Sequence, residues 1–526
     1  MSQIEILAEN IKLARLLGVQ PDELTYLKAL DAGQLRSLRL RLTNSLFDET
    51  GASFRRVVTA SKLLPNGMVA LIGEKVFGAM LCARISGLMP PNRAYEIALK
   101  LPDAFLAKVS VELDPRSARE VIARMPADRV TAIAAILVER RDYVTMGRFV
   151  DYLSRDTIRQ VMESIDDDTA ILRTAFFVEN KTALNDLVRL MPVERIRRLV
   201  ILAGDERHDL WTEAVGLMSH VNDDWKRRIG DLAAEQDESV LSGLAHAAQR
   251  LRLWDSVLPI VGCMSESSQR KLAGLPVLAS REVLDRVIAA ADANGLWAAM
   301  LPLVGYMGAD VRRTAAQVFE HLPQDTLQRL IAAAGALQLW PELIGILGDM
   351  DQAEQRNVVR LIGEQDEAVL MQLLEAVDRA GLWAAVLPLI SLMGPEARKT
   401  AARVVPGLPP QVLQQLMDTA NQLALWPTLL GILGNLPDTE QRQVAQLISA
   451  QPMPLLRGLL EAIHASGLWA ELLQLLRHFD DAQLRRLAAL LEGRDEQRHA
   501  LFVAAQQQGP GLNARLADVL GTPAPP

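Results

Sequence analysis

The chain has 526 residues, of which 50% are hydrophobic, 4% aromatic and 23% charged. The mean hydropathy of +0.11 excludes an intrinsically disordered chain, because there is ample apolar material for an aliphatic core. The formal net charge of −8 argues against a nucleic-acid partner, since binding phosphates requires clustered basic side chains.

Two cysteines, Cys82 and Cys263, stand in no CxxC motif, and the first residues carry no signal-peptide pattern. We therefore predict a protein of the reducing cytoplasm. Arginine outnumbers lysine by 46 to 10, a ratio typical of bacteria with GC-rich genomes. The seven histidines are scattered, and no phosphate-binding, dinucleotide-binding or serine-nucleophile motif occurs. We expect no catalytic residues, no metal site and no cofactor.

The N-terminal segment, residues 1–60, is predicted to be helical, with a polar break at 48–53. The stretch that follows, 64–89, is the most apolar of the chain. Charged residues such as Glu74 and Arg84 interrupt it, whereas a helix that spans a bilayer needs about 20 consecutive apolar residues. We therefore predict a buried helix or a buried helix pair here rather than a membrane span.

Residues 61–205 contain a short repeat. The segment 89–102 (MPPNRAYEIALKLP) aligns with 113–126 (LDPRSAREVIARMP) at a spacing of 24 residues. Each copy predicts an amphipathic helix that is opened by a proline and closed by another. The segments 152–165 and 190–203 are looser copies.

The phrase LDPRSAREVIARMPADRV (113–130) resembles the short helical repeats in the cytosolic N-terminal domain of MgtE-type magnesium transporters. The resemblance covers residues 85–205 and implies a right-handed helical superhelix. The sequence shows neither the pore-forming membrane segments nor the nucleotide-sensing module of that family. Magnesium transport is therefore not implied.

A longer repeat governs residues 206–510. Seven tryptophans, each preceded by leucine, are spaced by 43 residues: Trp211, Trp254, Trp297, Trp340, Trp383, Trp426 and Trp469. Apolar residues 13, 10, 9 and 6 positions before each tryptophan from Trp254 onward mark one face of a first helix. The tryptophan opens a second helix, and apolar residues 18 and 21 positions after it predict a third.

Three helices in about 43 residues are typical of HEAT and armadillo repeats, and the phrase GADVRRTAA (308–316) resembles the HEAT turn. Units two apart are more similar than neighbours, which indicates a doubled period of 86 residues. We therefore predict an all-α fold, an α-solenoid over 206–510 with a helical N-terminal region. A flexible tail is predicted at 511–526, with a short helix at 512–520 and disorder at its end.

A basic residue stands 16 positions after every tryptophan of this ladder: Arg227, Arg270, Arg313, Arg356, Lys399, Arg442 and Arg485. We call these seven residues the basic row. They form a candidate surface for an acidic partner, with inter-repeat hydrogen bonding to acidic residues of the preceding turn as the structural alternative, which we favour. The tryptophans are similarly either core spacers, which we favour, or an exposed stripe. Carboxylate runs at 166–168 and 223–224 are interpreted as helix N-caps.

Solenoids offer long concave surfaces and few polar pockets. The leading hypothesis is therefore a non-enzymatic scaffold or adaptor that binds a protein partner along its concave face. The alternative is a carrier, or membrane-surface binder, of a lipid or another hydrophobic ligand. It rests on the positive mean hydropathy and on the apolar block 64–89.

Overall fold

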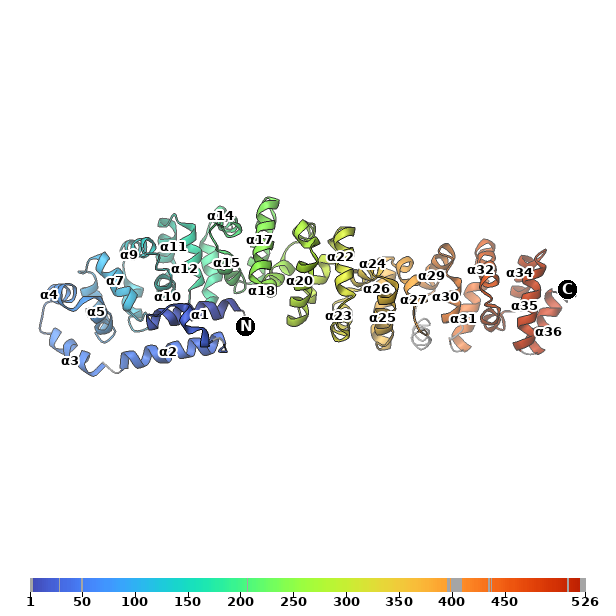
Figure 1. The fold of residues 1–526 in the computed structure, drawn as a ribbon, viewed down its shortest axis with the longest axis horizontal. Helices are drawn as coiled ribbons and strands as arrows, with labels where there is room; N and C mark the ends of the chain where they lie inside the picture. The colour runs from blue at the N-terminus through green and yellow to red at the C-terminus, as the bar shows by residue number, and fades with distance from the viewer. Residues whose placement is uncertain are drawn as a thin grey trace. The chain divides into compact units, whose positions relative to one another are not determined.

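The computed structural model describes residues 3–27, 29–48, 51–205, 207–394, 398, 409–433, 436, 438–508 and 510–520. All regular secondary structure in these residues is helical, which confirms the predicted all-α class. The chain divides into two compact units, Met1–Val277 and Leu278–Pro526. Within each unit, helices pack mainly on neighbours two or three places along the chain, as in a helical-repeat solenoid (Figure 1).

The N-terminal unit begins with α1 (Gln3–Leu17), η1 (Pro21–Leu27), α2 (Ala32–Asp48), α3 (Gly51–Ser61), α4 (Asn66–Ile72), the π-helical turn η2 (Gly73–Phe77) and α5 (Gly78–Ser86). The short repeats form α6 (Pro91–Ala98), α7 (Asp103–Glu112), α8 (Arg119–Arg124), α9 (Ala127–Glu139), α10 (Tyr143–Phe149), η3 (Val150–Tyr152), α11 (Arg155–Ser164), α12 (Asp168–Phe176), η4 (Lys181–Ala183), α13 (Leu184–Leu190) and α14 (Val193–Gly204). The first part of the tryptophan ladder supplies α15 (Trp211–Met218), α16 (Asp223–Ala234), α17 (Glu238–Leu251), α18 (Trp254–Cys263) and α19 (Glu266–Ala273), before η5 (Pro276–Ala279).

The apolar stretch 64–89 is helical, but one of its faces is not buried. Ala70 on α4 packs against Ile97 and neighbouring apolar residues, whereas Leu71 is 57% exposed and Val76 on η2 is 71% exposed. The expectation of a buried helix or helix pair is therefore wrong for the outer face. Within the described ranges, no helix is both long and apolar enough to cross a membrane.

Arginines link successive short repeats. Arg195 on α14 donates to two backbone carbonyl oxygens at and just beyond the end of α11 and pairs with Asp168 at 2.8 Å. Arg129 on α9 reaches two carbonyl oxygens just beyond α6, at 3.1 and 2.6 Å, and Arg93 on α6 reaches the end of α3. Each arginine stands three residues after a proline. The arginine of each of these short repeats therefore donates hydrogen bonds to carbonyl oxygens at the end of an earlier helix, where the helix itself offers no partner.

The second unit contains α20 (Arg281–Asn294), α21 (Trp297–Tyr306), α22 (Ala309–Phe319), α23 (Gln324–Leu337), α24 (Trp340–Asp349), α25 (Gln352–Gly363), α26 (Glu367–Ala380) and α27 (Trp383–Ser391). It ends with α29 (Pro410–Gln422), α30 (Trp426–Leu433), α31 (Asp438–Ser449), α32 (Met453–Ser466), α33 (Trp469–Leu476), α34 (Asp481–Leu491), α35 (Asp495–Gln508) and α36 (Pro510–Leu520). The predicted three-helix unit recurs in these residues.

Every ladder tryptophan is the first residue of its helix. Six of them are between 0% and 7% exposed, and Trp211 is partly buried against the core of the first unit. The indole nitrogen often donates to the side chain five residues earlier, as in Trp254 to Gln249 at 2.9 Å and Trp426 to Asn421 at 3.1 Å. The tryptophans are therefore core spacers, as predicted, and do not form an exposed stripe.

The first ladder helices, α15 to α19, belong to the N-terminal unit, and the predicted domain boundary at 205/206 stays a prediction. At the other end, the predicted tail 511–526 is helical in its first part. As predicted, a short helix forms there: α36 packs on α34 and α35. Residues 521–526 lie outside the described residues, so disorder at the end of the tail stays a prediction.

Candidate functional site

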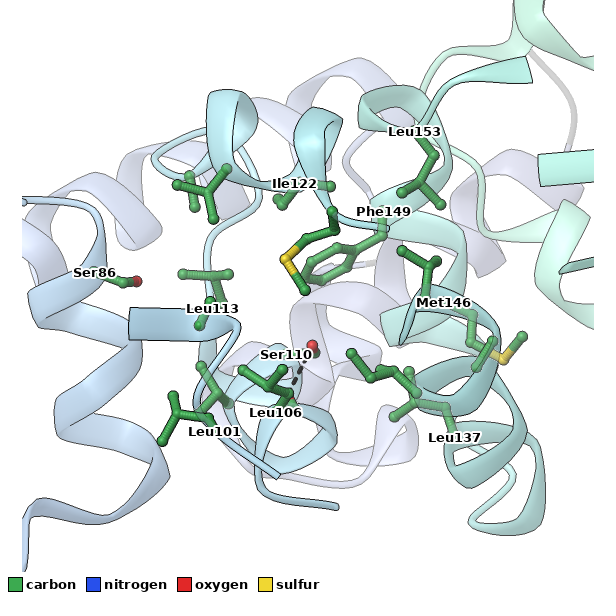
Figure 2. Close-up of a pocket in the computed structure, with 18 of the residues that line it drawn as sticks. Ser86, Leu101, Leu106, Ser110, Leu113, Ile122, Leu137, Met146, Phe149 and Leu153 are labelled. Atoms are coloured by element: carbon green, nitrogen blue, oxygen red, sulfur yellow. Dashed lines mark hydrogen bonds between the residues drawn. The ribbon is translucent and has the colours of Figure 1, made fainter. Parts of the chain in front are cut away.

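The interior of the short-repeat region contains a cavity of about 260 Å³. Its lining residues come from α3 to α13 and their connections, all within the N-terminal unit. Figure 2 shows Leu106, Leu113, Ile122 and Phe149 around this space. The prolines of the short repeats set where these helices begin, and the arginine hydrogen bonds described above link successive repeats. The apolar faces of the helices therefore lie opposite one another across the cavity.

Among the described residues, no charged side chain lines the cavity. Its few hydroxyl groups already have partners. The Ser110 hydroxyl donates to the Leu106 carbonyl at 2.9 Å, as Figure 2 shows, and the Ser86 hydroxyl donates to the carbonyl of Ala83 at 2.8 Å. The Cys82 thiol lies 3.3 Å from the Gly73 carbonyl oxygen, and burial raises its pKa to about 11, so it stays protonated.

An uncharged wall with satisfied hydroxyls selects apolar contents. A water molecule needs two to four polar partners to occupy a buried site, and an apolar cavity of about 150 Å³ is known to stay dry and to bind small hydrocarbons. A charged group would lose its hydration here without compensation. The arrangement can therefore hold a hydrocarbon chain or ring, and it offers nothing for acid–base or nucleophilic chemistry.

A second cavity of about 210 Å³ has charged side chains in its wall and lies between α1, α2, the segment after α12 and the end of α15. The buried Lys12 ammonium lies 3.1 Å from Glu9 and 3.4 Å from Glu179, and Arg39 pairs with the same two carboxylates at 3.0 and 2.9 Å. Lys181 donates to a backbone carbonyl at 2.7 Å, and burial lowers its pKa to about 8. The ion pairs of Lys12 and Arg39 with Glu179 join α1 and α2 to the repeats.

The described members of the basic row lie on the third helix of their repeats. Three of its members pair within their own helix: Arg270 with Glu266 at 2.6 Å, Arg313 with Asp310 at 3.3 Å and Arg442 with Asp438 at 3.7 Å. Arg227 donates to the carbonyl of Cys263 at 3.1 Å, Arg356 and Arg485 are exposed, and Lys399 lies outside the described residues. The Arg227 bond therefore reaches the next repeat.

Bonds within a repeat, from the third helix back to the second, are made at the position just before the basic row, which sequence reasoning missed. Gln269 donates to the Val261 carbonyl and Gln355 to the Leu347 carbonyl, each at 2.9 Å and near the end of the second helix of its own repeat. Gln441 donates at 2.9 Å to the Leu436 carbonyl, which lies beyond the end of α30. At the intervening repeats this position holds arginine, at Arg312 and Arg398. The signal was present as glutamine recurring every 86 residues.

The carboxylates of the two acidic runs interact with residues three positions along the chain. The Asp167 side chain caps α12 by accepting from the backbone of Ala170 at 3.2 Å, as predicted. At the second run the cap is Asn222 rather than an aspartate, and Asp223 pairs with Lys226 at 2.9 Å. In the described part of the chain, no three histidine, cysteine or carboxylate side chains gather as a metal site would require.

No protein-family model matches the chain. No curated protein matches it. The resemblance to MgtE-type N-terminal domains therefore stays a prediction, and so does the HEAT or armadillo assignment.

Among solved structures, the pentatricopeptide repeat protein PPR10 from maize is similar at 12% identity over 95% of each chain, with a TM-score of 0.15. PPR10 in complex with an 18-nt psaJ RNA element is 13% identical over 99% of this chain and 100% of that chain, with a TM-score of 0.15. A circular tandem repeat protein is 17% identical over 96% and 98%, with a TM-score of 0.11. These identities and TM-scores are too low to indicate what this chain binds. The absence of a nucleic-acid partner therefore stays a prediction.

Proposed function

We propose that this chain is a non-enzymatic, cytoplasmic helical-repeat binding protein, and that its N-terminal unit holds a hydrophobic ligand in the apolar cavity. The observation that carries the proposal is the wall of that cavity, which has no charged side chain and whose serine hydroxyls are bonded to their own helices. Of the two functions that the sequence suggested, this favours the carrier of a hydrophobic ligand over the protein scaffold.

The ligand class follows from the same wall. Leu106, Leu113 and Phe149 offer dispersion contacts and no directional partner. The bound portion should therefore be an uncharged hydrocarbon chain, with any polar group left outside. Each methylene group removed from water should contribute about 0.8 kcal/mol, or about fourfold in affinity.

A series of nonionic alkyl ligands of increasing chain length tests the proposal in solution by isothermal titration calorimetry on the full chain. We expect the affinity to rise by about fourfold for each added methylene until the cavity is filled, and then to level off. No binding at any length, or an affinity that does not depend on length, would refute the assignment.

A matched pair of variants locates the binding. Ser110→Phe adds a ring inside the cavity and should reduce the affinity of the longest ligand at least tenfold. Ser164→Phe is the control, because Ser164 is exposed, does not line the cavity and also donates to a carbonyl of its own helix. Circular dichroism checks that both variants fold, and Ser86→Leu serves as a second, smaller obstruction. An equal effect of Ser110→Phe and Ser164→Phe would argue against the cavity.

A second candidate function is a protein scaffold that uses the basic row. The side chains of Arg270, Arg313 and Arg442 are 62%, 61% and 60% exposed, which leaves them accessible to an acidic partner. Native mass spectrometry of the protein purified from its own cells tests this function. A co-purifying polypeptide that is lost from an R313E/R356E variant of unchanged melting temperature would support the scaffold, whereas a bound mass of several hundred daltons would support the carrier.

A further inference from the structure

Large apolar side chains are exposed mainly on one part of the N-terminal unit. Of the seventeen that are exposed in the described chain, nine lie between Leu63 and Leu99. We define the α4–α5 patch as Leu63, Met68, Leu71, Val76 and Met80, whose exposed fractions range from 49% to 87%. A soluble protein rarely concentrates exposed apolar side chains in this way unless they meet a partner or a membrane.

The charge around the patch is opposite to that of the whole protein. Residues 54–100 contain seven basic and two acidic residues, a net charge of +5, in a chain of net charge −8. Lys62, Lys75 and Lys100 are exposed, and Lys100 lies against the start of α4. Exposed apolar side chains rimmed by lysine are typical of helices that lie on anionic lipid surfaces.

The patch also lies at the end of the repeat stack. α4 and α5 pack on α6 and α7, the next helices along the chain, and α4 lies at one end of the unit in Figure 1. The end repeat of a solenoid normally carries a polar outer face, because no further repeat covers it. Here the outer face is apolar, whereas Ala70, Gly73 and Ile85 of the same three helical segments line the cavity.

We propose that the α4–α5 patch docks the protein onto an anionic lipid bilayer, so that a lipid chain reaches the cavity through the segment that lines it. Docking rests on exposed apolar and basic side chains, and passage of the chain rests on the proposed function as well. The occupant of the patch is the bilayer surface. Its apolar side chains enter the interface between headgroups and acyl chains, and the lysines meet the anionic headgroups.

Vesicle sedimentation with the full chain tests the docking. The vesicles contain phosphatidylcholine alone or phosphatidylcholine with about one quarter phosphatidylglycerol. We expect binding to the anionic vesicles that is at least tenfold tighter than to the neutral ones and that weakens as salt is added. Equal binding to both compositions, or no binding, would overturn the proposal.

Two charge-neutral double variants assign the surface. L71Q/V76Q should reduce binding to anionic vesicles at least tenfold, because it removes two exposed apolar side chains of the patch. V193Q/I201Q is the matched control, since Val193 and Ile201 are 46% and 42% exposed on α14 of the same unit, and it should bind as the unaltered protein does. Retained binding by L71Q/V76Q, or an equal loss in the control, would refute the assignment.

Vesicle binding tests the docking proposal, and alkyl-ligand binding tests the cavity proposal, so the two proposals can be refuted separately. Neither Leu71 nor Val76 lines the cavity, so L71Q/V76Q should keep its affinity for alkyl ligands in solution. Vesicle binding without any alkyl binding would support docking and refute the cavity, whereas the reverse result would refute docking alone. A concentration-dependent dimer that L71Q/V76Q dissociates, measured without vesicles, would assign the patch to a second copy of the chain and overturn the proposal.

Discussion

The residue two positions before each ladder tryptophan from Trp254 onward adopts the left-handed conformation at the end of the first helix of the repeat. At alternate repeats it is glycine, at Gly295, Gly381 and Gly467, with φ between +66° and +69°. At the others it is Arg252, Gln338 and Ala424, with φ between +55° and +58°. Glycine adopts this conformation without the clash of a Cβ atom, so the non-glycine repeats are strained at this point.

A glycine exchange within the second unit should reveal this strain. Ala424→Gly should stabilise the protein by roughly 0.5–1 kcal/mol, because relief of about 1–2 kcal/mol of left-handed strain exceeds the added entropy of the unfolded chain. Gly381→Ala should destabilise it by a similar amount. Urea unfolding followed by circular dichroism measures both, and shifts in the same direction would contradict the argument.

Trp340 is fully buried, and Gly335 stands where other repeats supply an acceptor for the indole nitrogen. That nitrogen has no hydrogen-bond partner among the described residues. Trp340→Ala should therefore cost mainly packing, roughly 3–5 kcal/mol of unfolding free energy. The melting temperature measures the loss. Trp225, which is outside the ladder and only partly buried, provides the comparison, and an unchanged melting temperature for Trp340→Ala would show that the ladder is not core.

At the scale of elements, the charged side chains that contact α1 should make the stability of the N-terminal unit depend on pH. His220 lies 3.1 Å from Glu5 of α1. Burial, and after it the nearby Lys181 ammonium, lowers the pKa of His220 below its ordinary 6.5. The unfolded chain therefore binds a proton at this position before the folded chain does.

Because the unfolded state binds more protons here, stability should fall as the pH drops through about 6.5. His220→Gln should remove part of this dependence. His246→Gln, a change at an exposed histidine of the same unit, serves as the control. Thermal unfolding between pH 7.5 and pH 5 measures the difference, and identical slopes for the unaltered protein and His220→Gln would contradict the prediction.

At the scale of the whole molecule, the described helices of the second unit pack on close neighbours along the chain. α24 packs on α27, and α27 packs on α30, in the second unit. Stability in such an array is a sum of repeat and nearest-neighbour contributions, so coupling between sites should fall off after one repeat.

Double-mutant cycles with Trp→Phe should show this limit. W340F and W383F lie in adjacent repeats and should couple by at least about 0.5 kcal/mol, whereas W340F and W426F, two repeats apart, should add within about 0.5 kcal/mol. Urea unfolding of the single and double variants measures both terms. Equal coupling in the two pairs would show that the repeats do not act as nearest neighbours.

The sequence by itself determined the helical repeat, the helix that each tryptophan opens and the burial of those tryptophans. These features are local, because the spacing of apolar residues sets the face of a helix and each neighbouring repeat presents the same face. It also located the basic row, but not its bonding. Whether Arg313 pairs with Asp310 of its own helix or with another repeat depends on distances that spacing does not contain.

Only the tertiary structure decided the cavity and the α4–α5 patch. The cavity wall combines residues more than 100 positions apart, from Val57 to Met191, so no local pattern marks it as hollow. The stretch 64–89 is the most apolar of the chain, yet Ala70 is buried and Leu71 is exposed. A side chain is buried only where another helix covers the face on which it lies. The repeat array ends at the outer face of α4, so Leu71 stays exposed.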